Sequence, residues 1–521
     1  MLNITKKYLS INKYNNQNEL FEDAFLSHPN YPSLFALTDS LNFLAIENIA
    51  LKVPKEQFVG LPDVFLAIQK DDFVLVKKEK SSVLIENDKG KKQNLSFNEF
   101  LDEWDQIIIA VEPNSSENDI SNTKSFYKWL LYTLPLASLI LLSVLSSSYN
   151  LGNFFLLGTS IIGLFLGSLI LQEKIGVKTD IASKFCNLTA EASCDSVIKS
   201  ETGKIFSWLG FTDLPILFFG INFFSLLLSS GQTGEMISIL SLVSIPFLLY
   251  SIWIQKVKIK KWCLLCLAVS LVIALQGVVF LFDGLQFEVN FVTQISPYLI
   301  SSILVFPAWM LLKPLIENEP KLKNELNKLK RFKRNFKIFQ SLTKELQSEI
   351  ELHKLKGIEF GNPNFSTNII LFLSPSCGHC HKAFEDAYKL HRKYPESVYL
   401  NVLFNVNPEN DQNPFKVVVE NLMLINSVNS EEAKDALIDW HINKVSLEVW
   451  KEKWKAPVYD MLVNNEIHNQ YNWCLGNELN YTPVKIINSK LFPDTYEISD
   501  LQFFMNDFEE EFEFHYKKIA Q

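Results

Sequence analysis

The sequence predicts a multi-domain membrane protein, in which an all-α helical-bundle core of six spans lies between an N-terminal α+β domain and a C-terminal α/β domain. Three observations lead to this fold class. The chain has 521 residues, enough for two to four domains, and 48% of them are hydrophobic, which is high for a purely soluble protein. Its middle contains long stretches without charge. Its two ends have the mixed composition and the short periodic segments of soluble domains.

The uncharged stretches predict the membrane spans. No Asp, Glu, Lys or Arg occurs over the 44 residues from Trp129 to Gln172, and "SSSYNLGN" divides this run into two segments. Shorter uncharged runs follow at Leu214–Gly234, Met236–Gln255, Trp262–Phe282 and Val289–Leu312. A helix of about 20 residues crosses the hydrocarbon layer, and a charge at its middle costs roughly 2.5–3.5 kcal/mol. One such run could be a buried soluble helix, but adjacent runs indicate an integral membrane protein with six spans.

Four regions are expected along the chain. Residues 1–120 form the α+β domain, with a helix in "SLFALTDSLNFLAI" and strands in "FVLVKK", "SVLIEND" and "IIIAVE". Residues 124–315 hold the spans, and residues 316–356 are a charged helical linker. Residues 357–521 form the α/β domain, with a strand in "TNIILFL", a helix, a strand in "SVYLNVLFNVN", a helical stretch of roughly 410–465 and a strand after "YTP".

Composition and motifs argue against several functions. The net charge of -9 is spread out, without the basic stripe of a protein that binds nucleic acid. The N-terminal "MLNITKKYLSINKYNNQ" lacks the apolar centre of a cleavable signal peptide. No G-x-x-x-x-G-K-[ST] motif occurs, which argues against an exporter ATPase.

Six of the seven cysteines fall into three close pairs and are the candidate catalytic residues. Cys377-Gly-His-Cys380 follows a predicted strand and opens a predicted helix. A helix N-terminus lowers the pKa of the first thiol, so that Cys377 can attack as a thiolate and Cys380 can resolve the mixed disulfide. Together with His381 the motif also matches Cys-x-x-Cys-His, the attachment signature of haem c, which stays an alternative. No metal site is predicted, because zinc would need a second suitably spaced pair in this domain.

The other two pairs belong to the membrane region. Cys263-Leu-Leu-Cys266 begins a predicted span directly after four lysines, although two ordinary buried cysteines would give the same pattern. Cys186 and Cys194 are spaced C-x7-C in the one long loop between predicted spans. Three crossings separate this loop from Cys263, so both pairs are expected on the same side of the membrane. Cys474 lies outside the pairs and is interpreted as a structural or free thiol.

The C-terminal region resembles the thioredoxin-fold oxidoreductases. The resemblance depends on Cys377-Gly-His-Cys380 after one strand and on Thr482-Pro483 before another. It implies that Pro483 is a cis-proline that faces the redox pair, and that Thr482 and Pro483 bind the backbone of the substrate. The His between the cysteines and the helical insertion before Thr482 are similar to the disulfide-forming branch of that family.

Residues of about 150–285 resemble the vitamin K epoxide reductase family. The shared features are a four-helix membrane core, a loop cysteine pair with the C-x7-C spacing, and Cys-x-x-Cys at the start of the fourth core helix. The resemblance implies that a quinone, ubiquinone or menaquinone, binds inside the bundle beside Cys266. It also implies that Cys263 exchanges with Cys186 and Cys194, and that Ser200 takes the place of a functional serine. Bacterial members are often fused to a thioredoxin domain through a fifth span, which is the arrangement expected here.

Residues 1–120 resemble the papain-like bacteriocin-leader peptidase domain of ABC exporters, in "SHPNYPSLFALTDSLNFLAIENIALKV" and "FNEFLDEWDQIIIAVEP". That family uses a Cys nucleophile near its N-terminus and a His at the start of the "FVLV"-type strand. This chain has no cysteine before Cys186, and Asp71 and Asp72 stand where the His would be. His28 is interpreted as a surface residue. We expect a degenerate domain that binds peptides and has no peptidase activity.

The residues and the resemblances together predict a quinone-coupled thiol oxidase that forms disulfides in exported proteins or peptides. Electrons would pass from substrate thiols to the membrane quinone pool through three pairs in turn: Cys377/Cys380, Cys186/Cys194 and Cys263/Cys266. The alternatives are a thiol reductase or isomerase that runs this relay in reverse, and a peptide-export or leader-binding membrane component.

The expected location is the bacterial inner membrane, with several spans and with the thioredoxin-like domain on the periplasmic side. Disulfide formation belongs in an oxidising compartment. The lysines before Cys263 and the basic stretch after Leu312 favour the cytoplasmic side by the positive-inside tendency. The chemistry of three cysteine pairs is the more specific signal, and it decides the predicted orientation.

Overall fold

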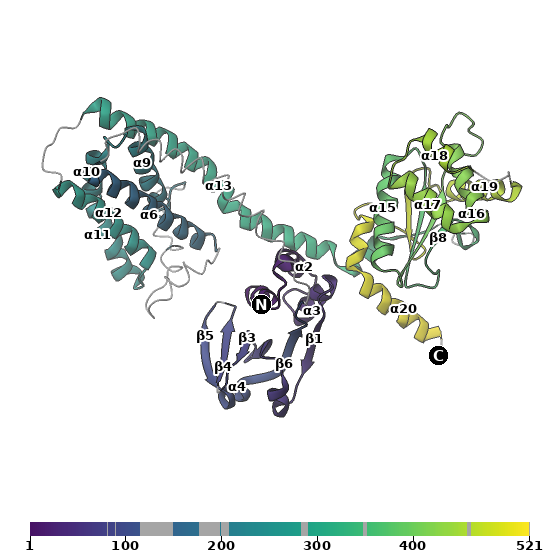
Figure 1. The fold of residues 1–521 in the computed structure, drawn as a ribbon, viewed down its shortest axis with the longest axis horizontal. Coiled ribbons are helices and arrows are strands. Elements are labelled where there is room, and N and C mark those ends of the chain that lie inside the picture. The colour runs from purple at the N-terminus through teal and green to yellow at the C-terminus, as the bar shows by residue number, and fades with distance from the viewer. Residues whose placement is uncertain are drawn as a thin grey trace. The chain divides into compact units, whose positions relative to one another are not determined.

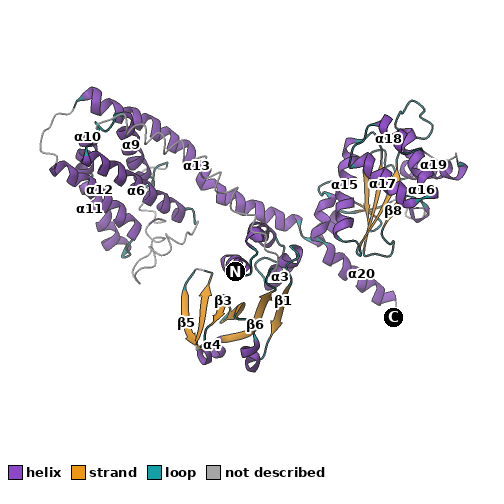
Figure 2. Cartoon of the chain, in the orientation of Figure 1, coloured by secondary structure: helices purple, strands orange, loops and turns teal. Residues whose placement is uncertain are grey.

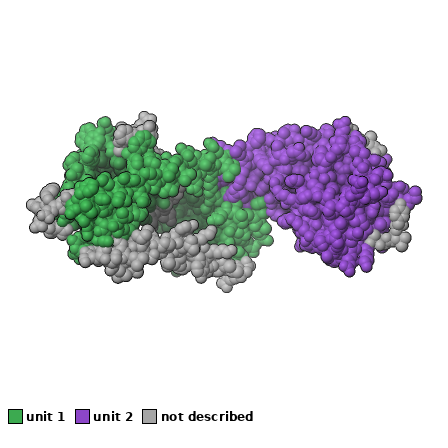
Figure 3. All heavy atoms as spheres, turned by 90° about the horizontal axis from the view of Figure 1, so that it is seen from above, with its two compact units in different colours: residues 1–22, 41–326 green, residues 23–40, 327–521 purple. Residues whose placement is uncertain are grey.

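The structure is a computed structural model that describes residues 1–80, 82–88, 90–114, 150–176, 198, 208–282, 290–346, 352–455 and 460–519. It divides into two compact units, residues 1–22 with 41–326 and residues 23–40 with 327–521 (Figure 3). Along the chain, a sheet domain is followed by a set of apolar helices and then by a second sheet domain (Figure 1). The predicted fold class is confirmed at this level.

The N-terminal sheet has six strands in the order β1-β6-β2-β3-β4-β5, and all neighbours are antiparallel. The predicted helix and the three predicted strands of this region are present among the following elements: α1 (Leu2–Ile11), η1 (Asn15–Gln17), α2 (Asn18–Leu26), α3 (Leu34–Phe43), β1 (Asn48–Lys52), η2 (Lys55–Gly60), β2 (Val64–Gln69), β3 (Asp72–Lys78), β4 (Ser82–Asn87), β5 (Lys92–Ser96), α4 (Phe97–Glu103) and β6 (Trp104–Val111).

Local sequence explains how this domain is built. Strand β2 reads "VFLAIQ", and its Phe65 and Ala67 are buried in one cluster with Phe58, Phe100 and other apolar side chains. Helix α4 begins where Ser96 and Glu99 cap its first turn through a pair of reciprocal hydrogen bonds. His28 is less exposed than predicted, since its side chain is only 12% exposed, and its Nε2 lies 3.0 Å from Asp39 Oδ2.

Apolar helices are present at five of the six predicted spans. The segments Leu151–Lys174, Gly234–Ile259 and Phe291–Lys333 are long and apolar enough to cross a membrane, and Leu214–Leu228 and Leu264–Phe280 are shorter. Their elements are α6 (Leu151–Lys174), α9 (Leu214–Leu228), α10 (Gly234–Val243), α11 (Ile245–Trp253), the π-helical η4 (Ile254–Ile259), α12 (Leu264–Phe282), the π-helical η5 (Phe291–Ile295) and α13 (Ser296–Lys333). The predicted span before residue 150 lies outside the described residues.

Close packing joins α6 to α9. A Cβ atom on Gly163 would lie 2.3 Å from the ring of Phe219, so only a glycine allows this approach. The buried cluster around the ring contains Leu166, Ile170 and Cys263. This packing places the Cys263 end of α12 against the last turns of α6.

A hydrogen-bonded polar network lies inside this otherwise apolar bundle. The side chain of Gln276 is fully buried, and its Nε2 donates to Thr159 Oγ1 at 3.0 Å and to Ser160 Oγ at 3.1 Å. Its Oε1 accepts from Asn222 Nδ2 at 3.3 Å, and Asn222 Oδ1 accepts from the Tyr298 hydroxyl at 3.3 Å. Since buried polar groups in a membrane protein must be satisfied internally, this network ties α12 to α6, α9 and α13.

An ion cluster connects the helices α6, α9 and α13. Asp213, just before α9, has no exposed surface, and its Oδ2 lies 2.6 Å from Lys313 Nζ of α13. Lys174, the last residue of α6, lies 3.9 Å from Asp213 Oδ1 and 2.9 Å from Glu317 Oε1. The C-terminal end of α6, the start of α9 and the middle of α13 therefore lie on one side of the bundle.

The expected linker at 316–356 is divided in the structure. Helix α13 continues from the apolar region to Lys333, while the residues after it belong to the C-terminal domain. Helix α14 (Phe336–Leu342) contributes Phe339 to the core of that domain, and β7 (Lys344–Glu345) pairs with β12. The buried ring of Phe339 explains this assignment, because it contacts Tyr496 and Phe504.

The C-terminal domain is a six-stranded sheet enclosed by helices, with the order β7-β12-β11-β9-β10-β8 (Figure 2). Strands β9 and β10 are parallel and joined by α15, and β11 runs antiparallel to β9. The elements after α14 and β7 are η6 (Leu352–Lys354), β8 (Ile358–Phe360), β9 (Thr367–Leu373), α15 (Gly378–Lys393), β10 (Val398–Phe404), α16 (Lys416–Val428), α17 (Ser430–His441), α18 (Leu447–Lys453), α19 (Met461–Gly476), β11 (Val484–Ile487), β12 (Lys490–Leu491), η7 (Ile498–Phe503) and α20 (Met505–Ile519).

Side-chain alternation along β9 produces two cores. Ile369 and Leu371 pack in the cluster that contains residues of α15 and α17, while Ile370 and Phe372 pack in a second cluster with residues of α19. The helical insertion predicted between the two motifs is present as α16 to α19. The sheet is thus covered on both faces, and its central strand β9 leads directly into the Cys377 turn.

Candidate active site

The first candidate site lies at the N-terminus of α15, directly after β9. Cys377 is the N-cap residue of α15, and its N–H donates to the Ser374 carbonyl at 3.1 Å. Cys380 lies one turn further along and has no exposed surface, whereas Cys377 is partly exposed. The Ser374 N–H donates to the Cys380 sulfur at 3.4 Å. The motif therefore presents one accessible sulfur and one covered sulfur.

The surroundings of the two thiols move their pKa values apart. Burial raises the pKa of Cys377, but hydrogen bonds with Thr482, with Cys380 and with the backbone at His379 and Cys380 outweigh burial and hold that pKa below its ordinary value. Burial raises the pKa of Cys380 to about 12. Near neutral pH, Cys377 is thus the thiol that more readily becomes a nucleophilic thiolate.

Thr482-Pro483 lies beside this pair. The bond between them is cis, and the Cys377 thiol donates to the Thr482 carbonyl at 3.4 Å. Strand pairing explains the contact, because Val484 at the start of β11 lies opposite Phe372 near the end of β9. The residues just before β11 are therefore carried to the turn that follows β9.

A groove of about 370 Å³ runs along the cis bond. Its walls include Thr482, Pro483 and both charged and aromatic side chains: His379, Lys382, Asp386, Tyr481, Lys485, Asp494, Tyr496 and Glu497. Lys382 and Glu497 form an ion pair of 2.8 Å at its edge. This groove can receive an extended peptide next to the accessible sulfur of Cys377.

Two residues of α17 support the redox turn and were not singled out from the sequence. The Trp440 Nε1 donates to the Pro375 carbonyl at 3.1 Å, just before the motif. His441 Nδ1 lies 3.0 Å from His381 Nδ1, just after the motif. Burial lowers the pKa of His441 to about 3 and also lowers the pKa of His381, so this pair is uncharged at neutral pH. The adjacent Trp-His in a predicted helix was visible in the sequence, but nothing local linked it to a motif 60 residues away.

The second candidate site lies in the membrane region, at the start of α12. Cys263 has no exposed surface, and Cys266, one turn later, is partly exposed. The Cys266 N–H donates to the Cys263 sulfur at 3.4 Å, so the two residues are in contact. The Cys263 N–H donates to the side-chain oxygen of Gln255 at 2.9 Å. Gln255, like Trp440 and His441, was not singled out from the sequence.

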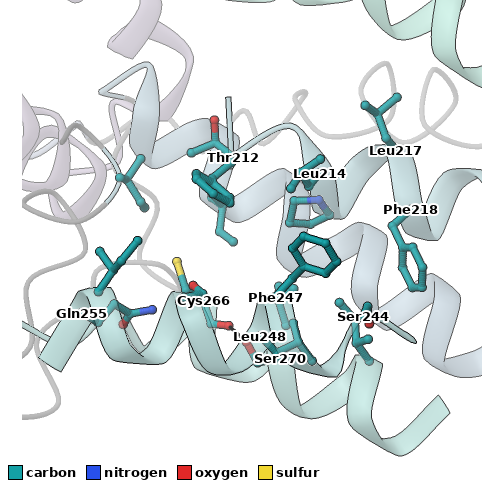
Figure 4. Close-up of a pocket in the computed structure, with 18 of the residues that line it drawn as sticks. Thr212, Leu214, Leu217, Phe218, Ser244, Phe247, Leu248, Gln255, Cys266 and Ser270 are labelled. Atoms are coloured by element: carbon teal, nitrogen blue, oxygen red, sulfur yellow. Dashed lines mark hydrogen bonds between the residues drawn. The ribbon is translucent and has the colours of Figure 1, made fainter. Parts of the chain in front are cut away.

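Cys266 lines an apolar cavity of about 410 Å³ in the same helical bundle. Figure 4 shows Gln255 and Cys266 near each other toward one end of this cavity, with the rings of Phe218 and Phe247 farther along it. The other lining side chains are aliphatic, with the exceptions of Phe211, Thr212, Ser244, Ser251 and Ser270. The volume lies within the range of about 300–1,000 Å³ that is typical of pockets for small molecules.

The loop pair and the predicted serine lie outside the described residues, so Cys186, Cys194 and Ser200 stay predictions. One described residue between them, Ile198, is buried in the cluster that contains Cys263. Ile198 also lines the cavity beside Cys266. Ile198, which stands four residues after Cys194 in the sequence, therefore lies close to the Cys263–Cys266 pair.

Cys474 has a structural position. It is fully buried on α19, in the cluster formed with Ile370 and Phe372 on the face of β9 away from α15. Burial raises the pKa of its thiol to about 12. A thiol that is both covered and protonated takes no part in exchange with Cys377 in the folded domain.

The haem and zinc alternatives can be compared with this geometry. His381, the last residue of the Cys-x-x-Cys-His string, contacts His441 inside the domain. Among the described residues, no group of three or more His, Cys, Asp or Glu side chains is arranged to hold a metal ion. The motif is a thiol pair beside the groove that runs along the cis bond.

Comparison with known proteins gives one family match. Residues 154–281 match the model of the vitamin K epoxide reductase family. These residues include Cys263, Cys266 and the described lining of the cavity, and they make up less than half of the chain. A search of curated proteins found no relative.

Several solved structures are similar to the chain at low identity. A periplasmic thioredoxin-like protein from Salmonella enterica serovar Typhimurium is 15% identical, with a TM-score of 0.27, and the match covers 31% of this chain and 98% of that one. Proteus mirabilis ScsC in a compact conformation is 12% identical, with a TM-score of 0.28 and coverages of 39% and 96%. Oxidised BdbD from Bacillus subtilis is 9% identical, with a TM-score of 0.25 and coverages of 33% and 98%.

The fold of residues 336–519 can be judged from its own topology. A β-α-β unit with the redox pair at the helix N-terminus, an antiparallel third strand and a cis-proline before that strand form the thioredoxin-like arrangement. The family match and the geometry of the two Cys-x-x-Cys motifs together support a thiol–disulfide redox role for a chain that combines a vitamin K epoxide reductase family region with a thioredoxin-like domain.

Proposed function

We propose that this protein is a quinone-coupled thiol oxidase that forms disulfides in exported proteins or peptides. The observation that carries the proposal is the position of Cys266 on the wall of an apolar cavity inside the membrane region, next to its partner Cys263. A thiol pair that opens onto such a cavity can reach a lipid-soluble oxidant, which a pair in an aqueous groove cannot. The Cys377–Cys380 pair, beside a polar groove, is suited to protein substrates.

Substrate oxidation begins at the Cys377–Cys380 pair in its disulfide form. A substrate thiolate attacks the Cys377 sulfur, which forms a mixed disulfide and releases Cys380 as a thiolate that takes up a proton. A second substrate thiolate then attacks the substrate sulfur of the mixed disulfide, which forms the substrate disulfide and releases the Cys377 thiolate. Two electrons pass from substrate to the pair. The low pKa of Cys377 makes it a good leaving group and favours this direction over reduction.

Thr482 and Pro483 hold the substrate in this proposal. The Thr482 carbonyl lies 3.4 Å from the Cys377 sulfur, so a peptide backbone that pairs with this edge would bring its own sulfur to Cys377. The charged walls of the groove at Lys382, Lys485 and Asp386 would contact the side chains of that peptide.

The relay to the membrane passes through Cys186 and Cys194 to Cys263, with Ser200 in a supporting position. Ile198 supports this order, because it packs against the Cys263 cluster and lines the cavity at Cys266. Each exchange breaks one disulfide and forms another, so that two electrons move toward Cys263 and Cys266 at every step.

The cavity residues fit a quinone. Apolar side chains surround a volume of about 410 Å³, the rings of Phe218 and Phe247 can contact a planar head group, and Cys266 provides a sulfur at the wall. When bound, ubiquinone or menaquinone would accept the two electrons and two protons that the Cys263 and Cys266 thiols release as their disulfide forms.

The proposed location is the bacterial inner membrane, with the thioredoxin-like domain on the periplasmic side. Apolar helices at five predicted spans and the family match support a membrane protein. The N-terminal domain is proposed to bind peptides without cleaving them. His28 pairs with Asp39 in this domain, but the sequence has no cysteine before Cys186. His28 therefore has no thiol nucleophile in this domain to activate.

The test uses the full chain in detergent micelles with decylubiquinone and a reduced peptide that contains two cysteines. Formation of the quinol is followed by absorbance, and formation of the peptide disulfide by mass spectrometry. The two products are expected in equal amounts. Cys266→Ala is expected to abolish both, and Cys474→Ala is expected to change neither. Peptide oxidation that continues without quinol formation in wild type, or at an unchanged rate in Cys266→Ala, would refute the proposal. If added quinol instead reduces a peptide disulfide, the electrons run from the quinol to the peptide, which is the reverse of the proposed direction.

A further inference from the structure

We infer that Gln255 is the residue that recognises the quinone head group, by donating a hydrogen bond to a quinone carbonyl beside Cys266. The inference rests on the proposed function, since it names the group that positions the acceptor in the same cavity. It assigns a role to a side chain at the end of a span that neither thiol pair requires for its own chemistry.

The first argument is the burial of Gln255 in a segment of otherwise exposed polar residues. Gln255 belongs to the π-helical turn η4, and its exposed fraction is 2%. The neighbouring Lys256 and Lys258 are exposed. The turn therefore directs one amide into the apolar interior while its lysines stay outside. π-helical turns of this kind occur frequently at functional sites.

The second argument is the hydrogen bonding of that amide. Its Oε1 accepts the Cys263 N–H at 2.9 Å, which orients the whole group. Its Nε2 donates no hydrogen bond to any residue that the structure describes. An amide donor left without a partner in an apolar interior costs free energy, and a ligand with an acceptor in the cavity would remove that cost.

The third argument compares Gln255 with other polar groups on the cavity wall. Ser244 donates its hydroxyl to the Ser241 carbonyl at 2.7 Å, and Ser270 donates to the Cys266 carbonyl at 3.0 Å. Their donors are therefore already used within their own helices. The hydroxyl of Thr212, which also lines the cavity, is buried without a partner among the described residues, but it does not contact Cys263 as the Gln255 amide does. Gln255 differs from these residues because its side chain holds the Cys263 N–H and its Nε2 still has a donor to offer, and it lies next to Cys266 in Figure 4.

The chemistry of the ligand matches this arrangement. An oxidised quinone carries two carbonyl oxygens on a planar ring and accepts hydrogen bonds without donating any. A single N–H donor next to Cys266 would fix one carbonyl near the sulfur, while the apolar walls hold the ring and tail. Because Gln255 also holds the Cys263 backbone, one amide would set the positions of both reactants.

The experiment compares wild type, Gln255→Met and the control Gln232→Met, at an exposed glutamine between α9 and α10 outside the cavity lining, as full chains in lipid nanodiscs, with the cysteines oxidised so that no turnover occurs. Met has a similar volume and lacks the amide. Affinity for decylubiquinone and for a short-chain menaquinone is measured by quenching of tryptophan fluorescence. Infrared difference spectra of the bound quinone report whether a carbonyl accepts a hydrogen bond.

In wild type, one carbonyl band is expected at the lowered frequency of a hydrogen-bonded group. In Gln255→Met that band should return to the free position, with binding about tenfold weaker, while Gln232→Met stays as wild type. Weaker binding with an unchanged carbonyl band would leave Gln255 a purely structural role and overturn the inference. A wild-type spectrum without any hydrogen-bonded carbonyl would overturn it without reference to a variant. If wild type binds neither quinone, the proposed function itself fails.

Discussion

Removal of the Lys313 charge should loosen the attachment of α13 to the apolar bundle. Lys313 Nζ lies 2.6 Å from Asp213 Oδ2 and donates to the Trp208 carbonyl at 2.9 Å. Asp213 has no exposed surface, so the Lys313→Met variant would leave a buried carboxylate without its main partner. In the proposed relay, α13 is also the helix that leads from the membrane region to the thioredoxin-like domain.

The size of the destabilisation in Lys313→Met follows from the contacts that Asp213 keeps. Breaking a buried ion pair costs about 3–5 kcal/mol, because an uncompensated charge stays in a poorly solvated place. Here Lys174 remains 3.9 Å from the other carboxylate oxygen, and the Gly210 N–H still donates to Asp213 at 2.8 Å. We therefore expect the lower end, about 3 kcal/mol, which corresponds to local opening that is about 100-fold more frequent.

The double variant provides the internal control. Lys313→Met with Asp213→Asn removes both charges and keeps an acceptor for the Gly210 N–H, and replacement of a whole buried pair is often close to neutral. The double variant should therefore lie within about 1 kcal/mol of wild type. Lys321→Met, an exposed lysine on the same helix, should have no measurable effect.

Hydrogen exchange measured by mass spectrometry on the full chain in micelles checks this expectation. Peptides at the start of α9 and around Lys313 in α13 should exchange about 100-fold faster in Lys313→Met, with little change in the N-terminal and C-terminal sheets. Equal exchange in wild type and Lys313→Met would show that the buried pair contributes no net stability. Additive effects of the two substitutions in the double variant would show that the charges do not interact.

Three further predictions concern the redox sites and their side of the membrane. Cys380→Ser should accumulate mixed disulfides between Cys377 and substrate proteins, seen as high-mass bands on non-reducing gels that disappear on reduction; a variant that forms none, although Cys377 still reacts with a maleimide, would contradict the relay. Because the pKa of Cys377 is below its ordinary value, iodoacetamide should still alkylate Cys377 in the reduced protein at a pH where a free cysteine no longer reacts. The stability that the thiolate contributes should be lost as the pH falls through the lowered pKa. A pH profile of alkylation like that of free cysteine would refute this. An impermeant maleimide applied to intact cells after mild reduction should label Cys377 and also a Ser116→Cys variant; labelling of Cys377 alone would leave five spans, and labelling of neither would invert the protein and reject the oxidase.

Much of the candidate site could be predicted from local sequence. Uncharged runs of about 20 residues predicted the apolar helices, because transfer of a charge into hydrocarbon is costly wherever the segment lies in the fold. The strand before Cys377 and the helix after it could be predicted in the same way, since alternation and helical spacing are properties of neighbouring residues. Thr482 and Pro483 were found through a motif and not through any contact.

Other parts of the site depend on contacts that no local pattern encodes. Gln255 stands eight positions before Cys263 in the sequence, and nothing in its neighbourhood shows that its amide holds the Cys263 backbone. Whether Cys263 or Cys266 lines the cavity depends on the rotation of α12 against α9 and α11, which the packing of many side chains decides together. The division of the expected linker likewise depends on Phe339, whose burial among distant aromatic rings places α14 in the C-terminal domain.

The sequence by itself therefore determined that the chain has an apolar helical middle, a Cys-x-x-Cys pair at each of two helix starts and a sheet domain at either end. These features follow from composition and short-range periodicity. Only the tertiary structure decided that Cys377 meets the Thr482 carbonyl, that His441 meets His381, and that Asp213 is buried against Lys313. Each of these contacts joins residues 60 or more positions apart, and their energies depend on burial and geometry that exist only once the chain has folded.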